Sequence, residues 1–357
     1  MGKKWDSSVP GLKWARACLR VLKPGGHIVA FGGTRTVHRL TVAIEDAGFE
    51  IRDMIAWAQY QGFPKSLNCS IAIDAQILSG GSGSLLINEM IKKRPGARRS
   101  TGSLPNAGIC SRQRRASSFT NDNPATPEAK LWDGYGTALK PSYEPAVLAR
   151  KPLSESSIAR QLLATGTGAL NIDGCRFAYG DPAWIGPQEG SGGWQGANGF
   201  TNTHEASNHG GLGSGDPGRW PANIYQCPKP SRGEREAGCE ELEAVTGAQA
   251  VNREPGSPGM GPRSGAGRTA AEIRNNHPTV KPLKVMRWLC RLVGAQPGSI
   301  VLDPFAGSGT TIMAATLEGF RAIGIEREER YVQIARARSR WAREEFMRER
   351  AQLELPW

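Results

Sequence analysis

A short stretch near the C-terminus carries the residue types of an adenosyl- or nucleotide-binding site. It reads Ser299-Ile-Val-Leu-Asp303-Pro-Phe-Ala-Gly307-Ser-Gly309-Thr-Thr311, and Gly324-Ile-Glu326 follows. The two glycines would let the backbone turn sharply and a ligand approach without a Cβ in the way. A helix beginning near Thr310 would aim free N–H groups and its positive dipole end at an anionic group. Glu326 stands 19 residues after Gly307 and could accept hydrogen bonds from ribose hydroxyls.

Two other glycine-loop sites are excluded by spacing. The phosphate-binding P-loop needs Gly-Lys-Ser/Thr, and residues 301–313 contain no lysine. The dinucleotide fingerprint needs a third glycine, where Ile312 stands. A structural glycine turn in an ordinary α/β protein remains the alternative to a binding site.

Helices and strands that could position this stretch are predicted at both ends of the chain. Residues 8–22 and 36–47 show helical spacing, and residues 27–31 and 49–57 read as strands, so the N-terminal part is α-β-α-β. At the C-terminal end, helices are predicted over 282–293, 310–317 and 328–348, and strands over 300–302 and 322–325. This alternation indicates an α/β fold with helices on both faces of a sheet.

The middle of the chain, residues 68–276, has no clear period and is rich in Gly, Ser, Pro and Arg. We predict an irregular inserted region there, with a few packed pieces. Its basic tract is a candidate for contacts to DNA phosphates, and the alternative is a solvated loop. The candidate contacts are Arg94, Arg98, Arg99, Arg114 and Arg115. Trp184, Trp194 and Trp220 lie among glycines and could stack on bases or pack in a core.

The amino-acid composition limits which binding partners and which cellular compartment are expected. The formal charge of +12 favours a polyanionic partner, although a soluble protein can also simply be basic. The seven cysteines are scattered without a CxxC pair, which favours reduced thiols in the cytoplasm and predicts no metal site. No apolar run is long enough for a membrane span. His204 and His209 have no evident catalytic partner, and we assign them no role.

The stretch Asp303–Thr311 closely resembles the S-adenosylmethionine loop of the DNA amino-methyltransferases, which methylate adenine N6 or cytosine N4. His277-Pro-Thr-Val-Lys-Pro282 is similar to the segment before this loop in the permuted group, in which the catalytic half comes first and the cofactor half last. Further segments resemble the family: Trp132–Leu153, Gly166–Arg176 and Gly218–Asn223.

The resemblance implies a Rossmann-like, seven-stranded methyltransferase sheet in permuted order, with an inserted DNA-recognition region. It implies three parts: residues 1–67 as the catalytic half, 68–276 as the inserted region and 277–357 as the S-adenosylmethionine-binding half with a C-terminal helix. It also implies that Glu326 takes the ribose and that Lys281 helps close the cofactor pocket. The other implied cofactor-binding residues are Asp303, Phe305, Gly307, Ser308, Gly309 and Thr310.

One motif of the family is missing. These enzymes carry Asp/Asn/Ser-Pro-Pro-Tyr/Phe/Trp, whose polar groups accept hydrogen bonds from the target amino group while the aromatic ring stacks on the flipped base. The nearest string here, Asp181-Pro-Ala-Trp184, lacks the second proline. In relatives the motif usually precedes a Gly-Lys-x-Trp-Asp string, and this chain opens Met1-Gly-Lys-Lys-Trp5-Asp6. The expectation is that the motif lies upstream of Met1, because either the start is misassigned or the gene is truncated.

The sequence therefore predicts S-adenosylmethionine-dependent methylation of an exocyclic amino group in double-stranded DNA, with adenine N6 favoured over cytosine N4. Two alternatives stay open: a non-catalytic remnant that binds cofactor or DNA, and an RNA methyltransferase. The oligomeric state, the recognition sequence and any partner nuclease are not indicated.

Overall fold

A computed structural model describes residues 9–61, 66–79, 124–178, 181–183, 218–246, 249, 272–294, 296 and 298–353. The chain divides into two compact units, one made of residues 1–61 and 142–357 and the other of residues 62–141. None of the helices in the described part of the chain has the length and apolar character needed to cross a membrane.

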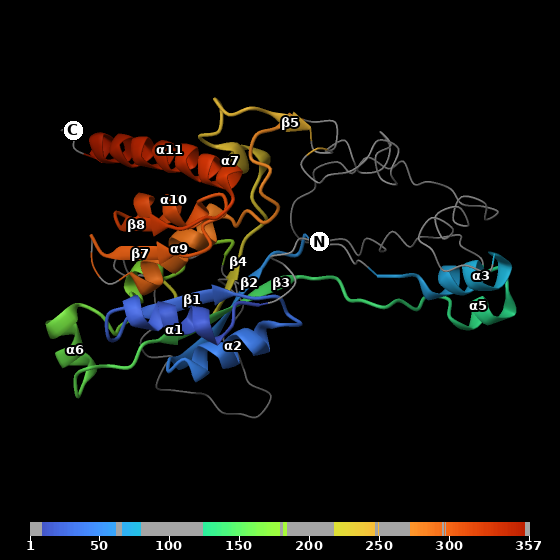
Figure 1. Cartoon of the computed structure of the whole chain (residues 1–357), viewed down its shortest axis with the longest axis horizontal. Coiled ribbons are helices and arrows are strands. Elements are labelled where there is room, and N and C mark those ends of the chain that lie inside the picture. The colour runs from blue at the N-terminus through green and yellow to red at the C-terminus, as the bar shows by residue number, and fades with distance from the viewer. Residues whose placement is uncertain are drawn as a thin grey trace. The chain divides into compact units, whose positions relative to one another are not determined.

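The larger unit contains a four-stranded sheet in the order β1-β3-β2-β4 (Figure 1). Its strands are β1 (His27–Phe31), β2 (Glu50–Ala58), β3 (Tyr143–Arg150) and β4 (Ile224–Gln226). Strand β3 runs antiparallel to both neighbours, whereas β4 runs parallel to β2. A register shift between Ile51 and Asp53 marks an irregularity in β2.

Helices cover both faces of this sheet, as the sequence predicts. Helices α1 (Leu12–Val21) and α2 (Val37–Asp46) pack with Val147 and Ala149 of β3. Helix α9 (Leu283–Val293) packs on the opposite side with Ala146 and Leu148, since successive strand residues point to opposite faces. The first four elements, α1, β1, α2 and β2, confirm the predicted α-β-α-β order with boundaries shifted by a few residues.

The position of β3 differs from the sequence prediction. Residues 143–150 were placed inside an inserted region, yet they form a central strand whose inner residues are almost fully buried. Strand β4 also joins the sheet, and residues 142–276 group with both ends of the chain. Local periodicity does not reveal β3, because its partner strands lie about a hundred residues away in the chain.

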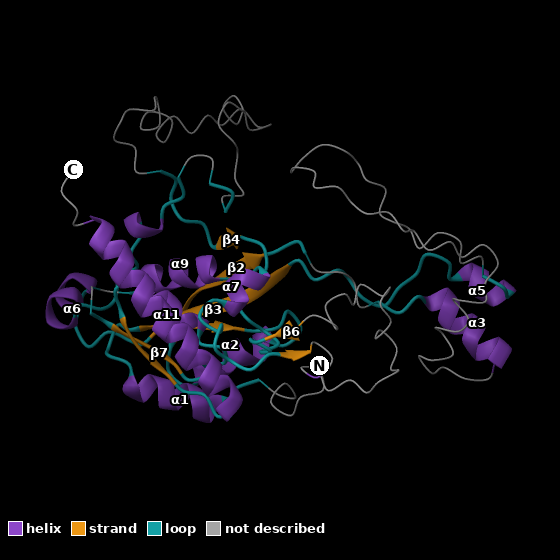
Figure 2. Cartoon of the chain, turned by 90° about the horizontal axis from the view of Figure 1, so that it is seen from above, coloured by secondary structure: helices purple, strands orange, loops and turns teal. Residues whose placement is uncertain are grey.

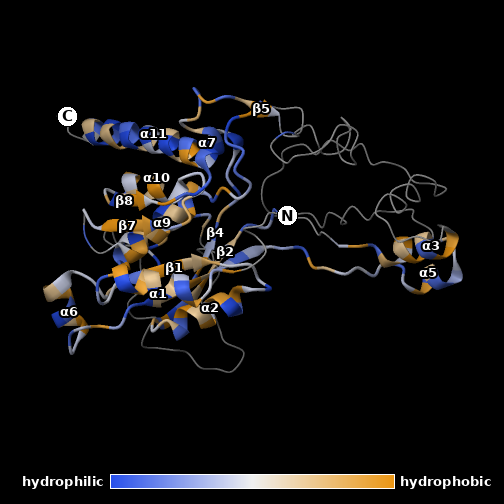
Figure 3. Cartoon of the chain, viewed as in Figure 1, coloured by the Kyte–Doolittle hydropathy of each residue, from blue (hydrophilic) through white to orange (hydrophobic). Residues whose placement is uncertain are grey.

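A second, parallel pair of strands holds the glycine-rich stretch. Strands β7 (Ile300–Asp303) and β8 (Arg321–Gly324) are connected through α10 (Thr310–Leu317), and Asp303 pairs with Gly324 at their carboxyl ends. Helix α9 contacts α10 through Cys290, Ala314 and Ala315, while α11 (Glu329–Leu353) packs on α10 through Met313, Leu317 and Ala342. These elements match the predicted C-terminal pattern closely. Figure 3 shows that α11 is largely hydrophilic and α10 largely hydrophobic.

The described strands do not form one seven-stranded sheet. No ladder in the described ranges joins β7 and β8 to the four-stranded sheet, and β5 (Val245–Thr246) pairs only with β6 (Glu272–Ile273). The remaining short elements of this unit are α6 (Ile158–Thr165), a 3₁₀ turn η2 (Asp173–Cys175) and α7 (Arg232–Glu236). Figure 2 shows β3 and β7 between α9 and α1 when the chain is seen from above.

The smaller unit is built on α3 (Cys69–Ser79) and α5 (Pro127–Leu131). Asp74 on α3 is fully buried and accepts hydrogen bonds from Ala125 N at 2.9 Å, Thr126 N at 3.0 Å and Thr126 Oγ1 at 2.8 Å. Thr126 Oγ1 in turn caps α5 by accepting a hydrogen bond from Ala129 N. This buried carboxylate therefore fixes the start of α5 against α3.

Candidate cofactor-binding site

The glycine turn after β7 has a backbone that only glycine adopts without strain. Gly307 and Gly309 have φ values of 53° and 77°, in the left-handed region. A Cβ on Gly307 would lie 2.7 Å from Nε2 of His277, and one on Gly309 would lie 2.9 Å from Cα of Ala335. Both glycines are therefore required by conformation and by space.

Carboxylates hold both ends of this turn. Asp303 Oδ1 accepts a hydrogen bond from Phe305 N at 2.9 Å, which shapes the chain as it leaves β7. Glu326, just after β8, accepts from Gly307 N at 2.8 Å through Oε2, and from Arg327 N and Glu328 N through Oε1. The sequence placed Glu326 at the carboxyl edge of the parallel strands, and the structure brings it into contact with the glycine turn.

Helix α10 begins directly after the turn. Gly309 is its N-cap, and the first backbone N–H groups of an α-helix have no acceptor within the helix. The positive end of the helix dipole thus lies beside the Glu326 carboxylate and the turn. This arrangement suits a ligand that combines hydroxyl groups with an anionic group.

Ser308 and Thr310 are turned into the protein. Their exposed fractions are 3% and 5%, and both side chains accept hydrogen bonds from the guanidinium of Arg338 on α11. Only their backbone groups therefore remain candidates for ligand contact.

Phe305, two residues before Gly307, is exposed, unlike Ser308 and Thr310. Its side chain is 59% exposed, and its ring lies 5.8 Å from the ring of Trp14 on α1. Trp14 lies within the helix that the sequence predicts over residues 8–22, and the sequence analysis gives it no role at this site. The pair forms an aromatic surface next to the glycine turn, where a planar ring could stack.

The segment before α9 connects the glycine turn to the four-stranded sheet. Lys281 forms an ion pair with Glu144 at the start of β3, and its ammonium lies 4.6 Å from the ring of Phe31 and 5.5 Å from that of Trp57. Lys281 therefore sits where β1 and β2 end and β3 begins, and its part in closing a cofactor pocket stays a prediction.

His277, which the sequence analysis gave no role of its own, packs directly on the glycine turn. Its ring contacts Tyr331 edge-on with centroids 4.6 Å apart. The pKa of His277 is lowered to about 4, chiefly by burial; Glu326 opposes the shift, and Arg235, Arg338 and Lys281 add to it. The imidazole is therefore neutral at physiological pH.

The candidate DNA contacts of the basic tract, from Arg94 to Arg115, lie outside the described residues, as do Trp184 and Trp194. Trp220 is described and well exposed, with the guanidinium of Arg176 5.1 Å above its ring. Asp181 accepts a hydrogen bond from Ala183 N, and Ala183 O accepts one from the backbone N–H of Gln226, the last residue of β4.

Within the described ranges, no group of three or more His, Cys, Asp or Glu side chains is arranged to hold a metal ion. Four of the cysteines that the structure describes are buried, and burial raises the pKa of Cys175 and Cys290 to about 12 and of Cys227 and Cys239 to about 11. These four thiols are protonated side chains of the core.

Arg338 was missed in the sequence analysis although a signal for it exists. It stands four residues after Ile334 and three before Trp341, which places it on the apolar face of its helix. A cation at such a position requires buried acceptors, and the glycine turn supplies them.

Comparison with known proteins gives a consistent family match. The model of a family described as DNA methylases of the N6/N4 type matches residues 11–76 and 169–337. The type II methyltransferase M.HindIII of Haemophilus influenzae is 24% identical over 90% of this chain and 65% of its own length. The DNA adenine methyltransferase YhdJ of Escherichia coli is 46% identical over 16% of this chain and 20% of its own length. The chain thus spans less than two thirds of these relatives.

Solved structures with a low overall likeness include M1.HpyAVI in complex with SAM, at 16% identity and a TM-score of 0.39, covering 92% of this chain and 80% of the other. The cytosine-N4-specific PvuII DNA methyltransferase matches at 13% identity and a TM-score of 0.38, covering 94% of this chain and 74% of the other. Because these scores are low, the family assignment rests on the sequence match.

Proposed function

This chain belongs to the N6/N4 family of DNA methylases, and we propose that it transfers a methyl group from S-adenosylmethionine to an exocyclic amino group of a DNA base. The observation that carries the proposal is the assembly of a glycine turn, a helix N-terminus and the Glu326 carboxylate at the carboxyl ends of β7 and β8. Ligands of open α/β sheets bind at this edge.

The side chains around the glycine turn fit such a cofactor. Glu326 keeps acceptor capacity for ribose hydroxyls, since a carboxylate offers about four lone-pair directions and uses three on backbone N–H groups. Phe305 and Trp14 offer an apolar surface for a purine ring. When bound, S-adenosylmethionine supplies an electrophilic methyl group. The chain's own part is to orient it and to hold the target amino nitrogen in line.

We propose adenine N6 as the target rather than cytosine N4. The support is the relative whose printed name is a DNA adenine methyltransferase and which is 46% identical over 59 residues. We also propose the permuted order, with the target-binding half first. The segments that form β1, β2 and β3 precede the glycine turn in the chain, which is the order that this arrangement requires.

The proposed partner is double-stranded DNA, contacted by the region between the two halves. The net charge of +12 supports a polyanionic partner, and the basic tract from Arg94 to Arg115 supplies candidate phosphate contacts. Trp220 with Arg176 above it is a further exposed aromatic group in that region.

The test is transfer of a tritiated methyl group to mixed-sequence DNA, followed by digestion to nucleosides. We expect label in N6-methyladenine and a large loss with Glu326→Ala. Label in N4-methylcytosine would show that the target is cytosine N4 and not adenine N6. Label in RNA but not in DNA would favour an RNA methyltransferase.

A second candidate is a protein that binds cofactor and DNA without transferring methyl groups. It is favoured by one observation, that the 357 residues contain no Pro-Pro pair and hence no polar-Pro-Pro-aromatic motif. Losing such transition-state hydrogen bonds typically costs on the order of a hundred- to a thousandfold in rate. Binding of cofactor and DNA with negligible methyl transfer by this chain would support this candidate.

A further inference from the structure

Arg338 is a buried cation in the middle of α11. Its side chain is 0% exposed, although a charged group without partners is costly to bury. Desolvation lowers the pKa of Arg338 to about 10, so the guanidinium is still charged at neutral pH. A side chain of this kind needs strong, fixed acceptors around it.

Those acceptors are on the glycine turn. Nη1 of Arg338 donates to Ser308 O at 2.9 Å, to Ser308 Oγ at 3.0 Å and to Thr310 Oγ1 at 2.9 Å. Ser308 lies between the two positive-φ glycines and Thr310 is the first residue of α10. The Arg338 guanidinium therefore fixes the glycine turn, the segment whose backbone has the greatest intrinsic freedom.

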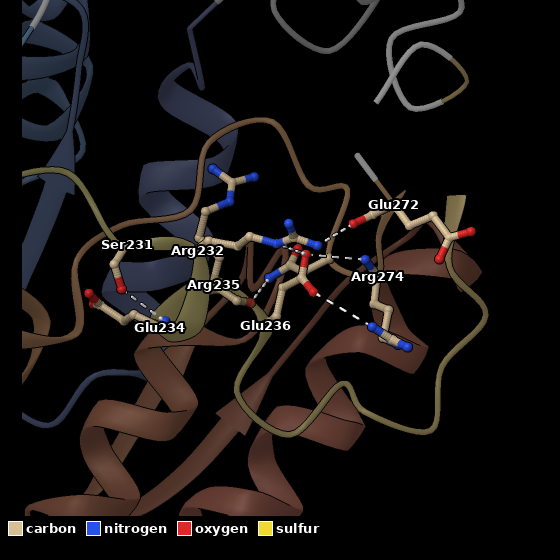
Figure 4. A network of polar contacts seen from close by, with 8 residues as sticks. Ser231, Arg232, Glu234, Arg235, Glu236, Glu272 and Arg274 are labelled. Atoms are coloured by element: carbon tan, nitrogen blue, oxygen red, sulfur yellow. Dashed lines mark hydrogen bonds and ion pairs between the residues drawn. The ribbon is translucent and has the colours of Figure 1, made fainter. Parts of the chain in front are cut away.

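The same guanidinium also holds a third segment. Nη2 donates to Glu234 O on α7 at 3.2 Å, while Nε has no partner in the described part of the chain. Around α7, Glu234 accepts from Leu283 N at the start of α9, and Arg235 donates to His277 O at 2.9 Å. Figure 4 shows Glu234 and Arg235 in the polar network of α7 that also includes Arg274 and Glu236.

His277 and α11 then close around the turn from two sides. The His277 ring occupies the space where a Gly307 Cβ would be, and Ala335, one turn before Arg338, occupies that of Gly309. The turn is therefore enclosed by His277 and α11, and Arg338 links α11 directly to the turn and to α7.

We propose that Arg338 is a positioning residue that sets the conformation of residues 307–310 for the cofactor before the cofactor binds. The expected change in cofactor affinity rests on the proposed function. Its structural part, an ordered turn in the free protein, is independent of any ligand. Arg338 itself is shielded from a ligand at the turn because its fork is occupied by protein acceptors.

The experiment measures amide hydrogen exchange in the cofactor-free chain and calorimetric binding of S-adenosylhomocysteine. Arg338→Met should speed exchange at residues 306–312 and weaken binding about ten- to a hundredfold, the loss expected for charge-assisted hydrogen bonds. Arg338→Lys, which keeps the charge without the fork, should lie between Arg338→Met and the native chain. Arg340→Met is the matched control because Arg340 is an exposed arginine on the same helix, and it should change neither measurement.

If Arg338→Met fails to fold, Thr310→Val removes one acceptor with little change of shape and should loosen the same amides. Exchange that rises equally over the whole chain would show a merely structural role and overturn the proposal. An unchanged affinity with a loosened turn would overturn it as well. If the native chain does not bind S-adenosylhomocysteine at all, the proposed function fails, and local loosening in Arg338→Met would still establish the positioning of the turn.

Discussion

At the scale of single residues, the candidate site depends on side chains whose usual roles are changed by their surroundings. Glu326 is held by three backbone N–H groups. The sequence predicts Ser308 and Thr310 as cofactor-binding residues. In the structure their hydroxyl groups accept hydrogen bonds from Arg338. Their types and spacing identified the right turn, but the direction of a side chain depends on a partner 28 to 30 residues away. Local sequence could not reveal that partner.

Gly307→Ala tests the fit of the turn against His277. The new Cβ meets both a positive φ and the His277 ring at 2.7 Å, so we expect a loss of about 2–4 kcal/mol in the free energy of unfolding. Gly298→Ala is the matched control, since Gly298 has φ 84° with nothing within 4 Å of a new Cβ. It should cost only about 1 kcal/mol, from backbone strain alone. Chemical denaturation measures both, and equal losses would show that the His277 contact does not constrain the turn.

The lowered pKa of His277 predicts that the folded chain loses stability in acid. Its pKa is about 4 in the folded chain and near 6.5 when unfolded, so the unfolded state binds the extra proton. Stability should therefore be intact above pH 6.5 and fall progressively as the pH drops toward 4, by about 3 kcal/mol at most from this residue. The measurement is the unfolding free energy from pH 7 to 4 for the native chain and His277→Asn.

His27 sets the control for this titration. Burial, with Arg150 and Arg52, also lowers its pKa to about 4, so His27→Asn should remove a comparable part of the slope while His277 keeps its own. An unchanged pH profile in His277→Asn would contradict the buried, neutral state of His277.

At the level of helices and strands, the sequence predicts the elements that are marked by short-range periodicity. The strand, glycine turn, helix and strand of 300–324 follow from short-range periodicity and two glycines, and the structure has them within one or two residues. Strand β3 was hidden because it is a strand only through its pairing with β1 and β2. Helix α7 was not predicted for a similar reason: its five residues are held by contacts to the segment 274–283.

The basic tract is the element whose role is still a prediction. If it contacts phosphates, the logarithm of DNA affinity should fall linearly with that of salt concentration, and neutralising the five arginines from Arg94 to Arg115 should flatten the slope by roughly one unit per lost contact. Neutralising the exposed Arg336, Arg340 and Arg343 of α11 is the control and should leave the slope unchanged. Fluorescence titration at several salt concentrations measures both. The same slope after all five changes would identify the tract as a solvated loop.

At the scale of the whole molecule, the family match and the fold lead to the same part of the chain. The match covers the helices and strands around the glycine turn and leaves out residues 77–168, which contain the smaller unit's α5 and the basic tract. We accordingly propose that residues 303–326 form a cofactor site in which Glu326 accepts hydrogen bonds from the ligand.

Calorimetric titration with S-adenosylhomocysteine measures binding at this site without a target sequence or catalysis. We predict saturable binding at one site per chain, weakened by about 1–3 kcal/mol in Glu326→Ala through the loss of buried hydrogen bonds. Glu328→Ala is the control, since Glu328 is an exposed neighbour whose side chain pairs with Arg327. No binding to the native chain, or an affinity that Glu326→Ala leaves unchanged, would contradict the assignment of this site.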